Sequence, residues 1–202
     1  MLIPKTIHQI WSSCNKPLPK AFVDLANTWK EFHPDWQYIF WDDQKMTAFM
    51  QRYYPDYVNF YNRFAYDVQR WDVIRYLILY QVGGLYVDFD TECLANIEAL
   101  LTADCCFGTD TKDNIIYAPL VNNAYLNNTY IASVPKHPFL KSVIDHVFNS
   151  DQMYVKEENK LLQVLRTSGA LMLSDVYNQY AFKEQIHVKE EQRLQYSFLV
   201  FL

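Results

Sequence analysis

Short apolar runs and longer helical periods alternate along the first half of the chain. Residues 3–11 and 36–41 are rich in β-branched and aromatic side chains, which is typical of strands. Residues 20–32 place apolar side chains at the spacing of one helix face, and Pro34 ends that run. A second helix is predicted over residues 42–53, where aspartate can cap the first turn. These four segments give the order strand, helix, strand, helix.

The longest helical pattern covers residues 64–82. Its apolar side chains recur at helical spacing, and the run ends at two glycines, as helices often do. Residues 85–89 follow directly and predict a buried strand. Strands that alternate with helices in this way form a parallel sheet with crossover helices. The pattern therefore predicts the α/β fold class.

The second half of the chain has a weaker periodicity. Strands are predicted at 105–108 and 115–118, and helices at 138–148, 157–167 and 170–182. No internal repeat or low-complexity stretch divides the chain, and 202 residues are the length of one domain. We therefore expect residues 1–202 to form a single domain.

Composition and charge exclude several classes of protein. The net charge of -5 is spread along the chain without a block of lysine or arginine, so nucleic acid is not an expected partner. Cys14, Cys93, Cys105 and Cys106 form no CxxC pair, which speaks against a zinc site or a redox motif. The first residues lack the zones of a secretory signal, and the apolar runs are too short to span a bilayer. We expect a cytoplasmic protein.

Two aspartates stand at the end of the predicted strand 85–89. Asp88 and Asp90 are spaced i and i+2, so the alternation of a strand would turn both to one side of the carboxyl edge, where open α/β sheets bind ligands. Two carboxylates so close repel each other unless a cation neutralises them, and oxygen ligands suit Mg²⁺ or Mn²⁺. An isolated Asp-x-Asp triplet is more often the start of a solvated turn.

A second charged pair on the preceding helix favours the site over the turn. Asp72 and Arg75 are i and i+3 neighbours on one helix face. Alone, such a pair is most often an exposed salt bridge. Because this helix is otherwise strongly apolar, we expect the pair to line an internal cleft. A guanidinium that faces two carboxylates there suits a phosphate and a sugar.

The first predicted strand adds two aromatic side chains. Trp11 ends this strand and is placed to stack on a nucleobase, although a tryptophan in such a strand is more often part of the core. His8, within the strand, is interpreted as a core histidine.

Several ordered blocks of the sequence resemble a known family. They are residues 3–11, Trp29, residues 72–80, residues 83–90 and residues 128–139. The sequence is similar to glycosyltransferase family 32, the glycosyltransferases whose sugar-binding region contains a DXD motif. Its members include yeast initiating α-mannosyltransferases and many bacterial capsule and lipopolysaccharide enzymes.

The resemblance implies a GT-A fold, with a Rossmann-like, mostly parallel sheet and flanking helices. The donor-binding part would cover about residues 1–110 and the acceptor-side part about residues 111–202. Trp11 would stack on the base of a nucleotide-sugar, Asp72 and Arg75 would grip the sugar and its phosphates, and Tyr86 and Asp88 would also contact the donor.

The resemblance also implies a cofactor, Mn²⁺ or Mg²⁺. Asp90 would bind the ion directly, and Asp88 would reach it partly through water. His187 is a candidate third ligand, because the sequence lacks the His- and Trp-containing tail common in the family. A further departure is the Thr-Ser-Gly-Ala step at residues 167–170, where the family usually has Gly-Pro, so that the acceptor-side loop is expected to differ.

The sequence thus predicts a metal-dependent, retaining hexosyltransferase. It would use a UDP- or GDP-sugar donor and a glycan or lipid-linked acceptor in surface polysaccharide synthesis, with peripheral contact at the inner face of the cell membrane. Two rivals stay open. A haloacid-dehalogenase-like phosphatase also sets two aspartates after an apolar strand, but Glu92 stands where its pattern has Thr or Val. A catalytically silent sugar-nucleotide-binding protein would keep the fold without the chemistry.

Overall fold

A computed structural model describes residues 2–12, 16–109, 124–149, 157 and 159–190. The described strands are β1 (Thr6–Ile10), β2 (Gln37–Trp41), β3 (Gly84–Val87), β4 (Cys105–Thr109), β5 (Asn127–Ser133) and β6 (Ile186–Glu190). They form one sheet in the order β2-β1-β3-β5-β4-β6. The pairs β1–β2, β1–β3 and β4–β6 are parallel, whereas β5 runs antiparallel to both β3 and β4. The α/β class is therefore confirmed, with a mixed, mostly parallel sheet.

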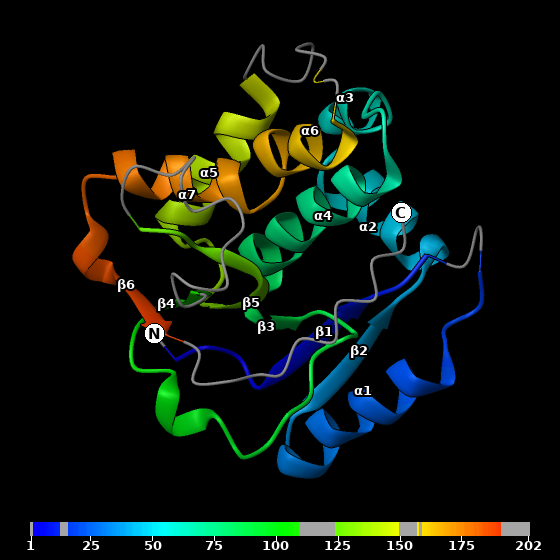
Figure 1. The fold of residues 1–202 in the computed structure, drawn as a ribbon, viewed down its shortest axis with the longest axis vertical. Helices are drawn as coiled ribbons and strands as arrows, with labels where there is room; N and C mark the ends of the chain where they lie inside the picture. Colours follow the sequence, from blue (N-terminus) through cyan, green and yellow to red (C-terminus); the bar gives the residue numbers. More distant parts are fainter. Residues whose placement is uncertain (1, 13–15, 110–123, 150–156, 158, 191–202) are drawn as a thin grey trace.

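Helices cover both faces of this sheet. They are α1 (Lys20–Phe32), α2 (Asp43–Tyr53), α3 (Val58–Tyr61), α4 (Asp67–Val82), α5 (Pro138–Asn149), α6 (Lys160–Thr167) and α7 (Ala170–Gln179), with short 3-10 turns at Pro55–Tyr57, Glu98–Leu100 and Lys183–Gln185. Figure 1 shows α1 on one side of the sheet and α4 to α7 on the other. Within the described ranges, no helix is both long and apolar enough to cross a membrane.

Helix α4 is the centre of the larger core. Val73, Ile74, Leu77, Ile78 and Leu79 are each at most 1% exposed, so the helix is buried around nearly its whole circumference. It packs against β3, β5, α5 and α6, and residues 72–79 of the helix are all buried. A charged side chain in the middle of this helix, between residues 72 and 79, is therefore buried.

Two glycines turn the chain from α4 into β3. Gly83 and Gly84 have φ angles of 68° and 106°, which side chains with a Cβ rarely adopt. A Cβ on Gly84 would also lie 2.6 Å from the carbonyl oxygen of Thr6 on the neighbouring strand. The glycine pair thus allows β3 to start directly at the end of the helix and to pair with β1.

Several predicted elements differ from the described ones. Helix α4 begins at Asp67, three residues later than predicted, and the predicted helix 157–167 begins at Lys160. Strands β5 and β6 were not predicted, because their apolar residues are interrupted by polar ones. The predicted strand 115–118 lies outside the described residues.

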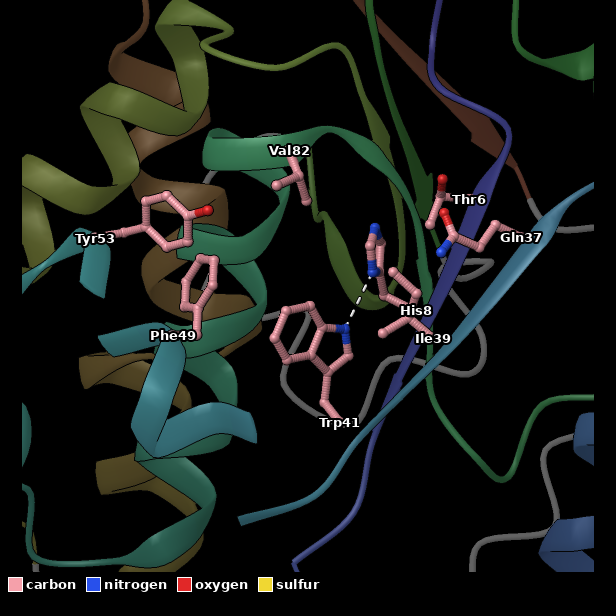
Figure 2. A pocket seen from close by; sticks show the side chains of 8 residues that line it. All are labelled: Thr6, His8, Gln37, Ile39, Trp41, Phe49, Tyr53 and Val82. Carbon is pink, nitrogen blue, oxygen red and sulfur yellow. Dashed lines mark hydrogen bonds between the residues drawn. The ribbon is translucent and has the colours of Figure 1, made fainter. Parts of the chain in front are cut away.

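His8 is a core histidine, as predicted. Its ring has no exposed surface, and Nδ1 accepts a hydrogen bond from Trp41 Nε1 at 3.1 Å (Figure 2). The ring is therefore neutral with its proton on Nε2, which donates to the carbonyl of Gly83 at 2.9 Å. Burial lowers the pKa of His8 to about 4. A cavity of about 260 Å³ lies beside this ring, also lined by Phe49, Tyr53 and Val82.

Acidification is expected to destabilise the fold through His8. Between pH 6.5 and 4 the unfolded chain binds a proton that the folded protein excludes, so stability falls as the pH falls through this window. Between pH 7 and 5 this amounts to about 2 kcal/mol. Asp72 and Asp90, whose pKa values are raised, act in the opposite direction, so the effect is isolated by comparison with His8→Gln. Urea unfolding at both pH values should show a shallower acid loss in the variant, and equal losses would contradict the assignment.

Candidate active site

The acidic pair lies in a turn, not on the strand itself. Strand β3 ends at Val87, and the backbone from Asp88 to Thr91 forms a turn closed by a bond from Thr91 N to the Asp88 carbonyl at 3.3 Å. The prediction that strand alternation orients the two acids is therefore wrong. The turn still keeps the two acids close. The negative charge of Asp88 is therefore one of the causes that raise the pKa of Asp90.

This turn is held by side chains from β1, β2 and α1. Gln9 Nε2 donates to the carbonyl of Asp88 at 3.2 Å, and Tyr38 OH donates to Gln9 Oε1 at 2.7 Å. On the other side, Trp29 Nε1 donates to the carbonyl of Thr91 at 3.1 Å. The backbone of the acidic turn is thus fixed by side chains from two parallel strands and from helix α1.

The carboxyl groups of the pair have different surroundings. Oδ1 of Asp88 accepts from Tyr86 OH at 2.5 Å and from Arg75 Nη1 at 3.1 Å. Among the described residues, no side-chain partner of Asp90 is found. Burial, and then the charge of Asp88, raise the pKa of Asp90 to about 6. Asp90 is thus a carboxylate whose negative charge is poorly compensated by the protein.

Arg75 joins the helix to the acidic turn. Its side chain is 7% exposed, and its Nη2 lies 3.0 Å from Asp72 Oδ1 while its Nη1 reaches Asp88. Nη1 also donates to the carbonyl of Asn128 at 2.8 Å, and the guanidinium lies over the Tyr86 ring, 4.4 Å from its centroid. Burial alone would lower the pKa of Arg75, but the carboxylates of Asp88 and Asp72 outweigh it and raise the pKa. Arg75 is therefore a permanent charge between two acids.

Asp72 points into the protein. Besides Arg75, its carboxyl accepts from Asn128 Nδ2 at 2.9 Å and from Ser168 Oγ at 2.9 Å. Burial raises its pKa to about 6, although Arg75 and the two hydrogen bonds counteract the shift. The pair is thus buried, and the Asp72 carboxyl is occupied by three protein donors. That the pair lines an internal cleft stays a prediction.

Asn128 and Ser168 are site residues that the motif-based analysis did not single out. Asn128 reaches the site through an irregularity in β5: Phe107 pairs with Ile131, but Gly108 pairs with Asn127, so three residues of β5 bulge between these partners. A bulge re-aims side chains and is frequent beside active sites. Only the block 128–139 of the family resemblance hinted at Asn128.

Trp11 lies next to the acidic turn. Its ring packs edge-on against Phe22 and Phe89, with centroids 5.6 and 6.1 Å apart, and its Nε1 donates to the carbonyl of Lys16 at 3.2 Å. Phe89 stands between the two aspartates, so Trp11 borders the site from β1. Its role in stacking on a base stays a prediction.

His187 does not share a site with the acidic pair. It lies on β6, which is separated from β3 by β5 and β4, a distance of roughly 14 Å at the usual strand spacing. Its Nδ1 contacts Thr102 Oγ1 at 2.7 Å. The expectation that His187 is a third metal ligand is therefore corrected, because the sheet order places it on an edge strand, three strands away from β3.

The acidic turn fits a divalent cation that arrives together with phosphate. Tyr86 and Arg75 occupy Oδ1 of Asp88, which leaves Oδ2 and the Asp90 carboxyl as ligands. No cluster of three or more His, Cys, Asp or Glu side chains occurs in the part of the chain that the structure describes. Mg²⁺ and similar ions are commonly held by one or two carboxylates plus substrate phosphates. The donor set matches that arrangement.

The sheet order and the flanking helices define the fold class as GT-A. The structure is similar to the UDP-bound glycosyltransferase domain from the YGT toxin, with a TM-score of 0.64 and 12% identity, over 94% of this chain and 80% of that one. At this identity the likeness shows the fold alone, and it confirms the GT-A prediction.

The sequence comparisons narrow this class to a family. Residues 19–107 match the family model described as glycosyltransferase sugar-binding region containing DXD motif. The chain is 32% identical over 181 residues to inositol phosphoceramide mannosyltransferase 1 of Schizosaccharomyces pombe, covering 88% of this chain and 52% of the relative. It is 30% identical over 179 residues to mannosyl phosphorylinositol ceramide synthase SUR1 of Saccharomyces cerevisiae, covering 89% and 43%. The chain belongs to glycosyltransferase family 32 and spans about half the length of these curated relatives.

Proposed function

We propose that this chain transfers a hexosyl group from a nucleotide-diphosphate sugar to a glycan or lipid-linked acceptor. The observation that carries the proposal is the Asp88–Asp90 turn, joined through Arg75 to the buried Asp72 at the carboxyl edge of the sheet. Family membership supports the reaction class. The phosphatase rival receives no support from the family model or from the relatives.

Each side chain of the site has a separate task in this reaction. Asp88 and Asp90 would hold Mn²⁺ or Mg²⁺, and the bound ion would supply positive charge that stabilises the departing diphosphate. Arg75 fixes the orientation of Asp88 and adds a permanent positive charge beside the phosphates. Trp11 offers an aromatic face at the edge of the site for the base. Retention of the anomeric configuration is part of the proposal.

The relatives suggest the sugar and the type of acceptor. The names of two of them describe mannosyl transfer to inositol phosphoceramide, a lipid, so mannose and a phosphorylated lipid-linked acceptor are the first candidates to test. These relatives are fungal and lend no support to a role in a bacterial capsule. A cytoplasmic location remains part of the proposal. Peripheral contact with a membrane is also part of it, because a lipid-linked acceptor would lie in the membrane.

A donor panel with and without chelator tests the reaction. With Mn²⁺ or Mg²⁺ we expect release of nucleoside diphosphate from GDP-mannose or from a UDP-hexose. In EDTA the release should be at least about a hundredfold slower, because no cation then neutralises the negative charge that builds on the departing diphosphate. Restored activity after Mn²⁺ addition is the control. Release that is unaffected by EDTA would contradict the metal role, and cleavage of p-nitrophenyl phosphate without sugar-nucleotide turnover would favour the phosphatase.

A further inference from the structure

A serine fastens the corner between α6 and α7 to the donor site. Ser168 has no exposed surface, and its Oγ donates to Asp72 Oδ2 at 2.9 Å. Its carbonyl accepts from Tyr76 OH at 2.9 Å, so the corner is tied to α4 by two hydrogen bonds. Ser168 stands in the step 167–170 that departs from the usual family pattern.

Ser168 completes a set of three donors around the Asp72 carboxyl. Arg75 and Asn128 both reach Oδ1, at 3.0 and 2.9 Å, which leaves Oδ2 to Ser168. The donors come from α4, from the β5 bulge and from the α6–α7 corner. Because Asp72 is 4% exposed, water cannot replace a missing donor, and the orientation of the carboxyl depends on all three.

The Ser168 hydroxyl has one proton and two acceptors within reach. Val164 O lies 3.3 Å from Oγ, farther than the Asp72 oxygen at 2.9 Å. An ionised carboxylate is the stronger acceptor, so the hydroxyl turns to Asp72 while Asp72 is charged. The bond to Asp72 therefore favours the ionised form that pairs with Arg75.

The position of Asp72 is passed on to the acidic turn. Arg75 contacts Asp72 through Nη2 and Asp88 through Nη1, at 3.0 and 3.1 Å. A planar guanidinium cannot shift one of these contacts without moving the other. If the Asp72 carboxyl rotated, the guanidinium of Arg75 would therefore move relative to Asp88.

We propose that Ser168 is a positioning residue of the donor site, which fixes the Asp72 carboxyl so that Arg75 is directed at Asp88. The inference rests on the proposed function, in which Asp88 contacts the donor and its metal. It also joins the two expected parts of the chain, since α6 and α7 belong to the acceptor side and Asp72 to the donor side. A movement of the α6–α7 corner would therefore change the position of Asp72, and through Arg75 that of Asp88.

Ser168→Ala, with Ser174→Ala as its matched control, tests the proposal. Ser174 is also fully buried, on α7, and its Oγ donates to Ala170 O at 2.6 Å and accepts from Leu126 N, so it contacts none of the site residues. Ser168→Ala should lower the turnover of donor hydrolysis at least about tenfold, the loss expected for one hydrogen bond to a charged group. Ser174→Ala should keep wild-type turnover, although both variants lose stability in urea unfolding.

A second readout does not depend on activity. In protein labelled with ¹³C at aspartate carboxyl carbons, the Asp72 signal is assigned with Asp72→Asn and titrated. The ionisable groups that face Asp72 are Arg75, Tyr76, Tyr86 and Asp88, and all four are kept in both serine variants. Ser168→Ala should raise the titration midpoint from about 6 by about one pH unit, and Ser174→Ala should not.

The outcomes separate this proposal from the proposed function. An unchanged Asp72 midpoint in Ser168→Ala overturns the positioning role whatever the turnover, as does an equal loss of turnover in Ser174→Ala. If the wild-type protein releases no nucleotide from any donor, the proposed function fails, and the titration alone decides on Ser168.

Discussion

Asp90→Asn is expected to remove metal-dependent donor turnover while leaving the protein folded. In the described structure the charge of the Asp90 carboxyl is poorly compensated, and burial and Asp88 together raise its pKa to about 6. Asparagine has nearly the same shape but no charge to attract a divalent ion. We expect kcat to fall at least about a hundredfold, because the loss of a catalytic metal removes several kcal/mol of charge stabilisation.

The stability of this variant separates a functional from a structural role. Its free energy of unfolding in urea at pH 7 should be no lower than that of the wild type, because the substitution removes a charge that burial disfavours. Asp145→Asn is a suitable control, since Asp145 forms an exposed pair with Lys141 on α5. Isothermal titration with Mn²⁺ and nucleoside diphosphate should detect binding in the control only. Wild-type turnover in Asp90→Asn would refute the proposed metal site.

Arg75→Met is expected to destabilise the protein and to abolish turnover together. Removing the guanidinium leaves the buried Asp72 and the partly buried Asp88 without their cation, and breaking a buried ion pair typically costs 3–5 kcal/mol, so we expect about that loss in the free energy of unfolding. Arg70→Met is the matched control on the same helix, because Arg70 pairs with Asp67 near the surface and such pairs contribute at most about 1 kcal/mol.

A double substitution shows whether the cost comes from the stranded acids. Adding Asp72→Asn to Arg75→Met removes one unpaired carboxylate, so the double variant should be more stable than Arg75→Met alone. The double variant should still show no turnover, because neither of the two neutral side chains that it introduces replaces the contact of Arg75 with Asp88. An Arg75→Met protein as stable as Arg70→Met would show that the pair is solvated and not part of a buried site.

Local patterns were sufficient for the elements that hold the donor side. The helix that ends at Gly83 and the strand after it can be predicted from a short stretch of sequence. Helical spacing of apolar residues, glycines at a helix end and a run of apolar strand residues all depend on residues that are close in sequence. The same holds for Asp72 and Arg75, whose spacing along one helix limits where they can lie. Asp88 and Asp90 stay close because they are two positions apart in one turn, although strand alternation did not orient them. The patterns by themselves predicted the α/β class, and the family resemblance of the ordered blocks implied the GT-A fold.

Only the tertiary structure decided which distant residues complete the site. Asn128 and Ser168 lie 56 and 96 positions from Asp72 and reach it through a strand bulge and a helix corner, neither of which leaves a periodic signal. His187 was a candidate ligand only because the family resemblance implies a third ligand for which this sequence lacks the usual tail, and the sheet order places it on the edge strand β6, away from the acidic pair. The reason is that sequence spacing determines directions within one element, whereas the order and sense of strands depend on how whole surfaces pack against each other.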